Sequence, residues 1–493
     1  MKSIFKYISL LAVAVVLLFT ATSCEDFLDV NVDPNNPTEV TPDLVLPTGL
    51  QYTSRYLKQD RYLSHLGNML MYNWSQSDGF SWYENEFLYN VTSSFYDQLF
   101  DFAYGNALKQ YQVLDKPDDP TMANYAAIAK VMKAYHFQIL VDLYGDIPYT
   151  EALLRKDEAT PKYDAAEDVY DALFDELSAA IDLINNAGAE ALVPTENDDV
   201  VFSGSMGSWV AFANTLKLRL LVRAQDTDVF GADDWATVDN ASFISSDVII
   251  NPGYLVEESK QNPLWNDLGW DPSGTQTLSS KATCATDYII NYLQSTNDPR
   301  IDYLYEKPED GHLGVVQGLA DYDTPVLDAF VPENVSNIGP GILKSGTMGS
   351  NIFTLAESYL LQAEAVQIGQ LTGDAKALYN AGVKASFDYL GASGSGTYLG
   401  LSIENTGWDG SSDKIEAIIT QKWIATNGIT AEQSWFDYNR TGFPSNLPVS
   451  LKASTADRPV KLLYPSGEIS ANGGEVPAQQ EAEAFTSKIF WAE

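Results

Sequence analysis

The sequence predicts a mostly α-helical fold, in which helical hairpins form a scaffold that one long, loop-rich insertion interrupts. Two patterns predict it. Apolar residues recur at steps of three and four in long segments of both halves of the chain, which is typical of amphipathic helices. Between these halves, residues 226–350 carry Gly, Pro, Asn and Asp throughout and contain few helical runs. Apolar residues make up 45% of the chain, which is enough for a large buried core.

The N-terminal segment has the organisation of a secretory signal. Two lysines precede an apolar run at 8–19, which is too short to span a membrane as a mature helix, and small residues then lead to Cys24. A cysteine at this place resembles the lipidation site of lipoprotein signals, so we expect a lipoprotein signal peptide over residues 1–23 and a lipid on Cys24. An ordinary signal peptide with a chance cysteine is the alternative. Residues 24–43 are rich in Pro, Asn and Asp and are expected to form a flexible tether.

The charge balance limits the possible partners. The chain has 67 Asp and Glu against 29 Lys and Arg, a net charge of −38. Nucleic acid and anionic lipid surfaces would be repelled, so we expect no nucleic acid, membrane attachment through the lipid anchor only, and a neutral ligand rather than a polyanion. With Cys24 lipidated, Cys284 has no intrachain partner. The three histidines are far apart and form no metal-binding pattern, so no metal and no cofactor are expected.

The first part of the folded chain combines a helix with an aromatic loop. Residues 44–71 are amphipathic and predicted to be helical, whereas 72–89 mix aromatic rings with Ser, Asn, Asp and Gly and fit neither helix nor strand. Aromatic side chains on a polar loop are costly to expose unless they meet a partner. They form either a stacking platform for sugar rings or a plug that packs the loop onto the helices, and the sequence leaves both open. The platform would use Trp74, Asp78, Trp82, Tyr83 and Asn85.

The scaffold is organised around residues 124–154. Their apolar stripe recurs at alternating steps of three and four, at Tyr125, Ile128, Met132, Tyr135 and Ile139. Gly145 follows the last periodic residue and Pro148 comes three residues later, so the helix is predicted to end near Tyr144.

Further amphipathic segments pair into hairpins. They lie at 95–113, 163–184, 208–223, 353–368, 374–389, 414–427 and 431–439. These segments place helical repeats at about 95–225 and 351–440. They resemble tetratricopeptide repeats, whose unit has about 34 residues, although the spacing is too irregular for a plain solenoid. No Gly, Ser or Pro linker divides the chain after residue 47, so residues 44–493 are predicted to form a single domain, with a tail at 459–493 that packs back on it.

The insertion, at about 226–350, is predicted to form loops and short strands laid over one side of the scaffold, with one helix at 285–295. Loops on a rigid scaffold often carry binding residues. The mixture of rings and polar side chains returns here at Trp265, Asn266, Asp267 and Trp270, and Tyr322 adds a further ring. We expect the early loop and the insertion to meet on one face away from the anchor, where rings stack on sugars while Asn and Asp bind hydroxyls.

Eight motifs in order along the chain resemble the SusD/RagB family of nutrient-binding outer-membrane lipoproteins. They are CEDFLDVNVDPNNPT, FQILVDLYGDIPYTEAL, PKYDAAEDVYDALFDELSAAIDLI, WVAFANTLKLRLLVR, YLQSTNDPR, FTLAESYLLQAEAVQIG, ITQKWIATNGITAEQSWFDYNRTGFP and KLLYPSGEISAN. Each motif alone is weak, but eight in the right order are specific. Most of them relate to the fold rather than the ligand, and Asp146 belongs to a helix stop rather than to a catalytic pair.

The resemblance implies a SusD-like fold and a place on the cell surface, at the outer membrane of Bacteroidetes. It implies a SusC-like TonB-dependent transporter as partner, to which an oligosaccharide, or in some members a peptide, is delivered. The helical repeats would face the transporter and the ligand site would lie on the opposite, loop-rich side. The family points to its ligand-binding aromatics by region only. The candidate ligand-binding residues are therefore Trp74, Asp78, Trp82, Tyr83, Asn85, Trp265, Asn266, Trp270 and Tyr322.

The expected function is that of a non-catalytic glycan-binding lipoprotein. A peptide-binding member of the same family, a surface glycosidase with two carboxylates and a repeat scaffold that binds only proteins are the alternatives. Because the chain has 67 acidic residues, chance carboxylate pairs carry no weight, and no nucleophile elbow, zinc-protease motif or phosphate loop occurs. Aromatic-rich polar loops favour a glycan binder over a protein-only scaffold.

Overall fold

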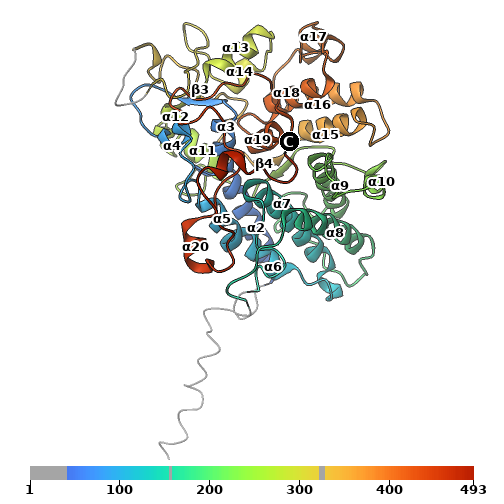
Figure 1. The fold of residues 1–493 in the computed structure, drawn as a ribbon. Helices are drawn as coiled ribbons and strands as arrows, with labels where there is room; N and C mark the ends of the chain where they lie inside the picture. The colour runs from blue at the N-terminus through green and yellow to red at the C-terminus, as the bar shows by residue number, and fades with distance from the viewer. Residues whose placement is uncertain (1–40, 155–157, 321–327, 493) are drawn as a thin grey trace, which may run out of the picture.

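The computed structural model describes residues 41–154, 158–320 and 328–492, and helices dominate its secondary structure, as predicted (Figure 1). The helices before the insertion are α2 Pro42–Lys58, α3 Leu63–Leu70, α4 Glu84–Leu88, α5 Gln98–Phe102, the π-helical η1 Ala103–Leu108, α6 Lys109–Leu114, the 3-10 turn η2 Pro120–Met122, α7 Ala123–Tyr144, α8 Ala166–Asn185 and α9 Met206–Arg223. Those after it are α15 Leu355–Gln367, α16 Ala375–Leu390, α17 Ser395–Leu399, the 3-10 turn η5 Trp408–Gly410, α18 Lys414–Thr426, α19 Ala431–Thr441, α20 Ser466–Asn472 and α21 Glu483–Thr486.

The insertion contains only short elements. They are α10 Ala232–Val238, β2 Val248–Ile250, α11 Pro263–Leu268, α12 Leu278–Ala282, β3 Thr283–Ala285, α13 Asp287–Ser295, α14 Ile301–Leu304 and the 3-10 turn η4 Asp328–Phe330, followed by β4 Ser350–Phe353 at its end. Two antiparallel strand pairs fasten the insertion to the rest of the chain. β2 pairs with β4, and β3 pairs with the early strand β1 Trp74–Gln76.

Helix α7 lies at the centre of the scaffold. It ends at Gly145, whose φ of +86° suits glycine, as the sequence predicted. The sequence also predicted a stripe on one face, but every residue of α7 except Lys133 is buried. Helices α6, α8 and α9 all pack against α7, and its alanines allow this close approach. The polar residues off the stripe are therefore buried as well, among them His136 and Asp142.

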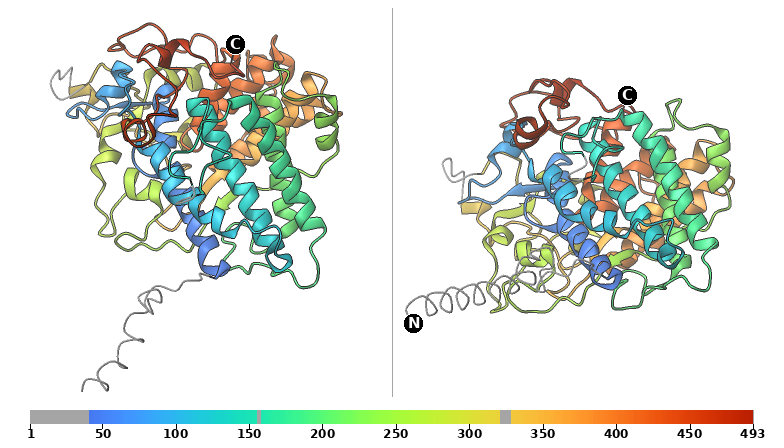
Figure 2. Two further views of the ribbon diagram at one scale, coloured as in Figure 1. Left: turned by 60° about the horizontal axis from the view of Figure 1, so that its bottom comes forward. Right: turned by 90° about the horizontal axis from the view of Figure 1, so that it is seen from below.

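The two sets of helical repeats join directly, although the insertion separates them in sequence. Helices α6–α9 run side by side, which both views of Figure 2 show in cyan to green. Helix α9 then packs on α15, and α15 packs on α16 and α18. An ion pair of 3.6 Å between Arg219 Nη1 and Glu357 Oε1 crosses the junction of α9 with α15. One hydrophobic cluster extends from Val45 to Trp491 across this junction.

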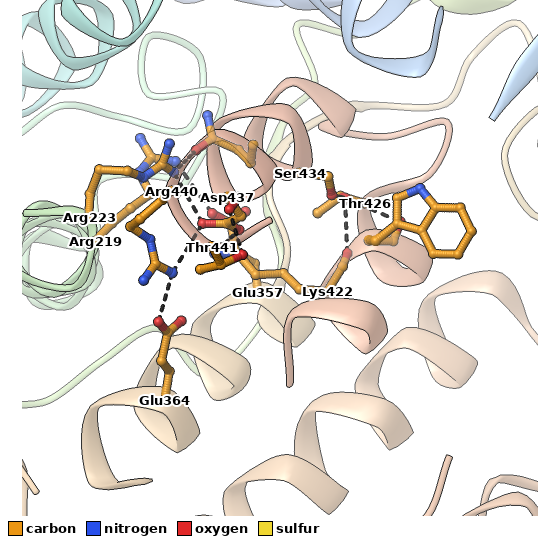
Figure 3. A network of polar contacts seen from close by, with 12 residues as sticks. Arg219, Arg223, Glu357, Glu364, Lys422, Thr426, Ser434, Asp437, Arg440 and Thr441 are labelled. Atoms are coloured by element: carbon orange, nitrogen blue, oxygen red, sulfur yellow. Dashed lines mark hydrogen bonds and ion pairs between the residues drawn. The ribbon is translucent and has the colours of Figure 1, made fainter. Parts of the chain in front are cut away.

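A cluster of buried charges holds helices α9, α15, α18 and α19 together (Figure 3). Arg440 Nη2 lies 2.7 Å from Glu364 Oε1, and Lys422 Nζ lies 2.7 Å from Asp437 Oδ2. Burial alone would raise the pKa of Asp437, but Lys422, Arg223 and Arg440 hold it below its usual value. Removing one partner of such a buried pair leaves an uncompensated charge and is strongly destabilising. Because these carboxylates are enclosed by the scaffold, they are out of reach of a ligand.

Two predicted boundaries differ from the structure. The single helix expected at 44–71 is divided into α2 and α3, because Arg61 in the connecting turn has a φ of +55°, which a helix does not accommodate. The sequence also predicts that the tail finishes in a short helix ending at Phe490 and Trp491, whereas the last helix, α21, ends at Thr486. The tail does pack back on the domain, as predicted, since Trp491 is 2% exposed.

The predicted signal peptide at 1–23, Cys24 and nearly all of the tether lie outside the described residues. Within the described part of the chain, no helix is both long and apolar enough to cross a membrane.

Candidate ligand-binding site

The early loop and the insertion meet, as the sequence predicted. Trp74 of β1 lies opposite Ala285 of β3, and the amide of Ser77 donates to the carbonyl oxygen of Ala282 at 2.9 Å. Figure 1 places α4 of the early loop beside α11, α12 and β3 of the insertion. This junction lies near the C-terminal end of α2, a helix of 17 residues and hence about 25 Å long. The chain enters the described domain at the opposite end of that helix.

The insertion carries a pair of half-buried tryptophans. The rings of Trp265 and Trp270 have centroids 5.0 Å apart and planes inclined at 40°. Asn266 lies between them in sequence and its side chain is exposed. Two neighbouring aromatic faces beside an amide form a surface for a ligand that has one apolar face and polar groups around its edge.

The tryptophan pair is held rigidly. The buried Asn262 caps α11 by accepting hydrogen bonds from the amides of Leu264 and Trp265, and its own amide donates to the carbonyl oxygen of Met348. A Cβ on Gly269 would lie 2.8 Å from Cδ2 of Trp265, so only glycine allows the indole to lie there. The amide group of Gln261 donates to the carbonyl oxygen of Trp270 at 3.1 Å. The arrangement of the Trp265–Trp270 pair is therefore largely formed before a ligand arrives.

The early loop contributes a second aromatic pair. The rings of Phe80 and Trp82 meet edge to face at 5.3 Å, and both are half-buried. Gln76, which is buried, accepts from the amide of Trp82 at 2.7 Å, and Arg61 donates to the carbonyl oxygen of Trp82 at 3.0 Å.

The two predicted polar residues of the early loop differ in their exposure. Asp78 is half-buried, its amide donates to the carbonyl oxygen of Phe330 at 2.8 Å, and its Oδ1 atom is buried without a hydrogen-bond partner within the described ranges. Asn85 is exposed and accepts from Asn90 at 3.0 Å. Of the two side chains, that of Asn85 is therefore the more open to a ligand at the edge of this loop.

Two of the predicted ligand-binding residues are core residues instead. Trp74 and Tyr83 are each 1% exposed, so their rings offer no face to a ligand. Both pack on the imidazole of His65, with centroids at 5.5 Å for Trp74 and 4.8 Å for Tyr83. These two rings do not belong to a stacking platform. They form the plug that packs the loop onto the helices. Tyr322 lies outside the described residues.

A polar cavity of about 590 Å³ adjoins α11. It is lined by the C-terminal part of α2, the turn after it and the start of α11, with the side chains of Gln51, Arg55, Gln59, Asp60, Tyr254, Ser259, Lys260, Gln261, Pro263, Asn266 and Asp267. Burial, and then the neighbouring Asp60, raise the pKa of Asp267 to about 8. Arg55, Gln59 and Lys260 were not among the predicted site residues, because polar residues on a helix end and in a loop carry no sequence signal of their own.

The comparisons with known proteins agree with this fold. The model of a SusD-like family, described as "Starch-binding associating with outer membrane", matches residues 34–465. The chain therefore belongs to the SusD-like family, and the resemblance of its motifs is confirmed. No curated protein sequence matches the chain.

Solved structures show the same fold. A SusD homologue from Bacteroides uniformis has a TM-score of 0.73 at 24% identity, covering 91% of this chain and 99% of that chain. A chitin-binding SusD homologue from Flavobacterium johnsoniae has a TM-score of 0.72 at 22% identity, covering 91% and 98%. A protein described as chitin-binding has a TM-score of 0.70 at 23% identity, covering 92% and 100%.

Proposed function

We propose that this chain is a non-catalytic glycan-binding lipoprotein of the cell surface, which captures oligosaccharides and passes them to a SusC-like TonB-dependent transporter in the outer membrane. The description of the family as starch-binding and the two chitin-binding structural relatives support glycan binding in general. Lipid attachment at Cys24 would hold the protein on the membrane, and the helical repeats would face the transporter.

The observation that carries this proposal is the Trp265–Trp270 pair. The two indoles are half-buried and pack on each other, and the exposed Asn266 lies between them in sequence. A sugar ring presents C–H bonds on one face and hydroxyls around its edge, so it matches a surface of this kind. Stacking on tryptophan uses apolar contact and few ordered hydrogen bonds. This suits a binder that must release its ligand to a transporter.

A neutral glycan is the preferred ligand class. The chain has a net charge of −38, and long-range repulsion opposes the approach of a polyanion. Arg55 and Lys260 line the polar cavity together with Asp60 and Asp267, so the two signs of charge are mixed there. Hydroxyl groups can bind to such a surface without a net charge of their own.

A panel of polysaccharides tests the proposal. The mature protein is run in native gels that contain glucans, mannans, xylans, soluble chitin derivatives or polyuronates, and the reducing ends released from each are measured. We expect retarded migration in at least one neutral glycan and no reducing ends. Release of reducing ends would indicate a glycosidase. Retardation by polyuronates alone at low salt would contradict the neutral ligand, and binding of peptides with no glycan bound would favour the peptide-binding alternative.

A further inference from the structure

Three side chains from two distant segments of the chain converge beneath the aromatic loop. Asp60 lies in the turn after α2, His65 lies in α3, and Asp267 lies in α11 of the insertion. One nitrogen of His65 and one oxygen of each carboxylate all lie within 4.8 Å of one another. The Nδ1 atom of His65 is 3.9 Å from Oδ1 of Asp60.

His65 is buried without a hydrogen-bond partner. It is 2% exposed, and among the described residues neither of its ring nitrogens has a partner. Buried polar atoms are nearly always hydrogen-bonded, so two unpaired nitrogens on one ring need an explanation. Trp74 and Tyr83 pack against the ring and fix its position. A neutral imidazole in this position has a lone pair to offer a ligand.

The other two histidines do not share this property. His312 has a partner on both nitrogens, Ser336 Oγ at 3.1 Å and Asp302 Oδ1 at 2.7 Å. The Nε2 atom of His136 lies 2.8 Å from Oγ1 of Thr53, while its Nδ1 atom has no partner in the described part of the chain. Among the histidines, all three of which the structure describes, His65 alone lacks a hydrogen-bond partner on both ring nitrogens.

The charge of Arg61 acts on both carboxylates, but its side chain does not pair with them directly. It donates instead to the carbonyl oxygen of Trp82 at 3.0 Å. Across the described residues, Arg61 forms no ion pair with Asp60 or Asp267 within 4.0 Å. Asp267 is 9% exposed, whereas half of the Asp60 side chain is accessible. Both carboxylates line the polar cavity of about 590 Å³, which gives a small ion a path to them from solvent.

We propose that Asp60, His65 and Asp267 bind a divalent transition-metal cation, for which Zn²⁺ is the probe. One imidazole nitrogen and two carboxylate oxygens suit Zn²⁺ or Mn²⁺, whereas Ca²⁺ takes six to eight oxygen ligands. Bonds of about 2.0–2.2 Å place ligand atoms roughly 3–4 Å apart, a spacing that small side-chain rotations reach from the present one. The bound ion would clamp the turn after α2 and α3 to α11, the helix that carries Trp265. The proposal does not depend on the ligand of the tryptophan pair.

Metal titration of the chelator-treated mature protein tests the site. Zn²⁺ is titrated calorimetrically in millimolar Mg²⁺, which occupies weak surface carboxylates, and Co²⁺ is added separately to observe its visible absorption bands. We expect one saturable Zn²⁺ site, Co²⁺ bands that Zn²⁺ abolishes, and a higher melting temperature with Zn²⁺.

Conservative variants distinguish this site from general binding to an acidic surface. Asp60→Asn and Asp267→Asn should each weaken Zn²⁺ binding at least tenfold. The matched control is Asp302→Asn, which removes the carboxylate beside the fully bonded His312 and should leave the affinity unchanged. Asp60 lies in a solvent-accessible turn, so its variant should fold even where a core variant does not.

Three results would overturn the proposal. The first is that no saturable site is found for Zn²⁺, Mn²⁺ or Co²⁺. The second is that Asp60→Asn and Asp267→Asn bind Zn²⁺ as tightly as the parent protein does. The third is that Ca²⁺ fills the site and Zn²⁺ does not compete with it.

Discussion

The indole N–H of Trp491 donates a hydrogen bond of 2.9 Å to Oδ1 of Asp142, so the end of the chain is tied to the central helix α7. The same carboxylate lies 3.5 Å from Nη1 of Arg223 in α9 and also accepts from the hydroxyl of Tyr170 in α8. Burial raises the pKa of Asp142 although Arg223 and its hydrogen bonds oppose this. One buried carboxylate thus connects two scaffold helices and the tail to α7.

We predict that Trp491→Phe lowers the free energy of unfolding by about 1–3 kcal/mol, because a buried acceptor loses its donor while most of the apolar contact remains. Urea denaturation measures the change. Trp408→Phe is the control, since Trp408 is half-buried in a 3-10 turn, where its ring packs on Tyr379 and lies beneath the ammonium group of Lys414. Equal stability of Trp491→Phe and the parent would mean that the tail is not held by this bond.

The apolar stripe read from the sequence predicts a cavity effect. Ile139 is fully buried in α7, so Ile139→Ala should cost about 2–5 kcal/mol of unfolding free energy. Ile469→Ala makes the same change at a residue that is 40% exposed and should cost much less. Glycan affinity per folded molecule should stay the same in both variants. If Ile139→Ala had the same stability as the parent, the apolar stripe would have been assigned to the wrong face of the helix.

The buried His136 predicts how stability depends on pH. Burial lowers its pKa from 6.5 to about 3, so the unfolded chain binds more protons than the folded chain between these values. Stability therefore falls as the pH drops from 6.5 towards 3, by about 1.4 kcal/mol for each pH unit from this one group. His136→Gln removes the titrating group. Between pH 6.5 and 5, its free energy of unfolding should therefore fall by roughly 2 kcal/mol less than that of the parent. Parallel pH profiles for the two proteins in chemical denaturation would contradict this prediction.

The lipid anchor remains a prediction of the sequence. Cys24→Ala should release the protein from the membrane fraction without a change in melting temperature, because the expected tether precedes α2. Metabolic labelling with palmitate measures the modification directly. Label that is absent from the parent protein would leave only an ordinary signal peptide.

The regular part of the fold could be read from the sequence because local chemistry determines it. Gly145 ends α7 where the periodic pattern stops, and the helices expected at 208–223 and 285–295 correspond to α9 and α13. The break at Arg61 was not predictable, because the contacts that accompany its positive φ come from residues far along the chain, the carbonyl oxygen of Trp82 and the side-chain amide of Gln98. The burial of α7 on all sides was not predictable either, because it depends on helices far along the chain.

The candidate site was predictable by region but not by residue. The early loop and the insertion do meet, yet Trp74 and Tyr83 face the core while Trp82 is half-buried at the loop surface. A sequence with one ring every few residues does not say which rings turn inwards, because a strand pairing such as β1 with β3 decides it. His65 gave no signal, since its two carboxylate neighbours come from a turn and from a segment about 200 residues away.

The central claim is that the Trp265–Trp270 pair binds glycan, and calorimetric titration of Trp265→Ala with the best glycan of the panel tests it most directly. Loss of one ring should weaken binding by roughly 1–3 kcal/mol, about 5- to 150-fold in Kd, with the affinity expressed per folded molecule. Trp408→Ala, which removes a half-buried ring from the repeats after the insertion, should leave the affinity unchanged. An unchanged Kd in Trp265→Ala, together with a large loss of stability, would contradict the account.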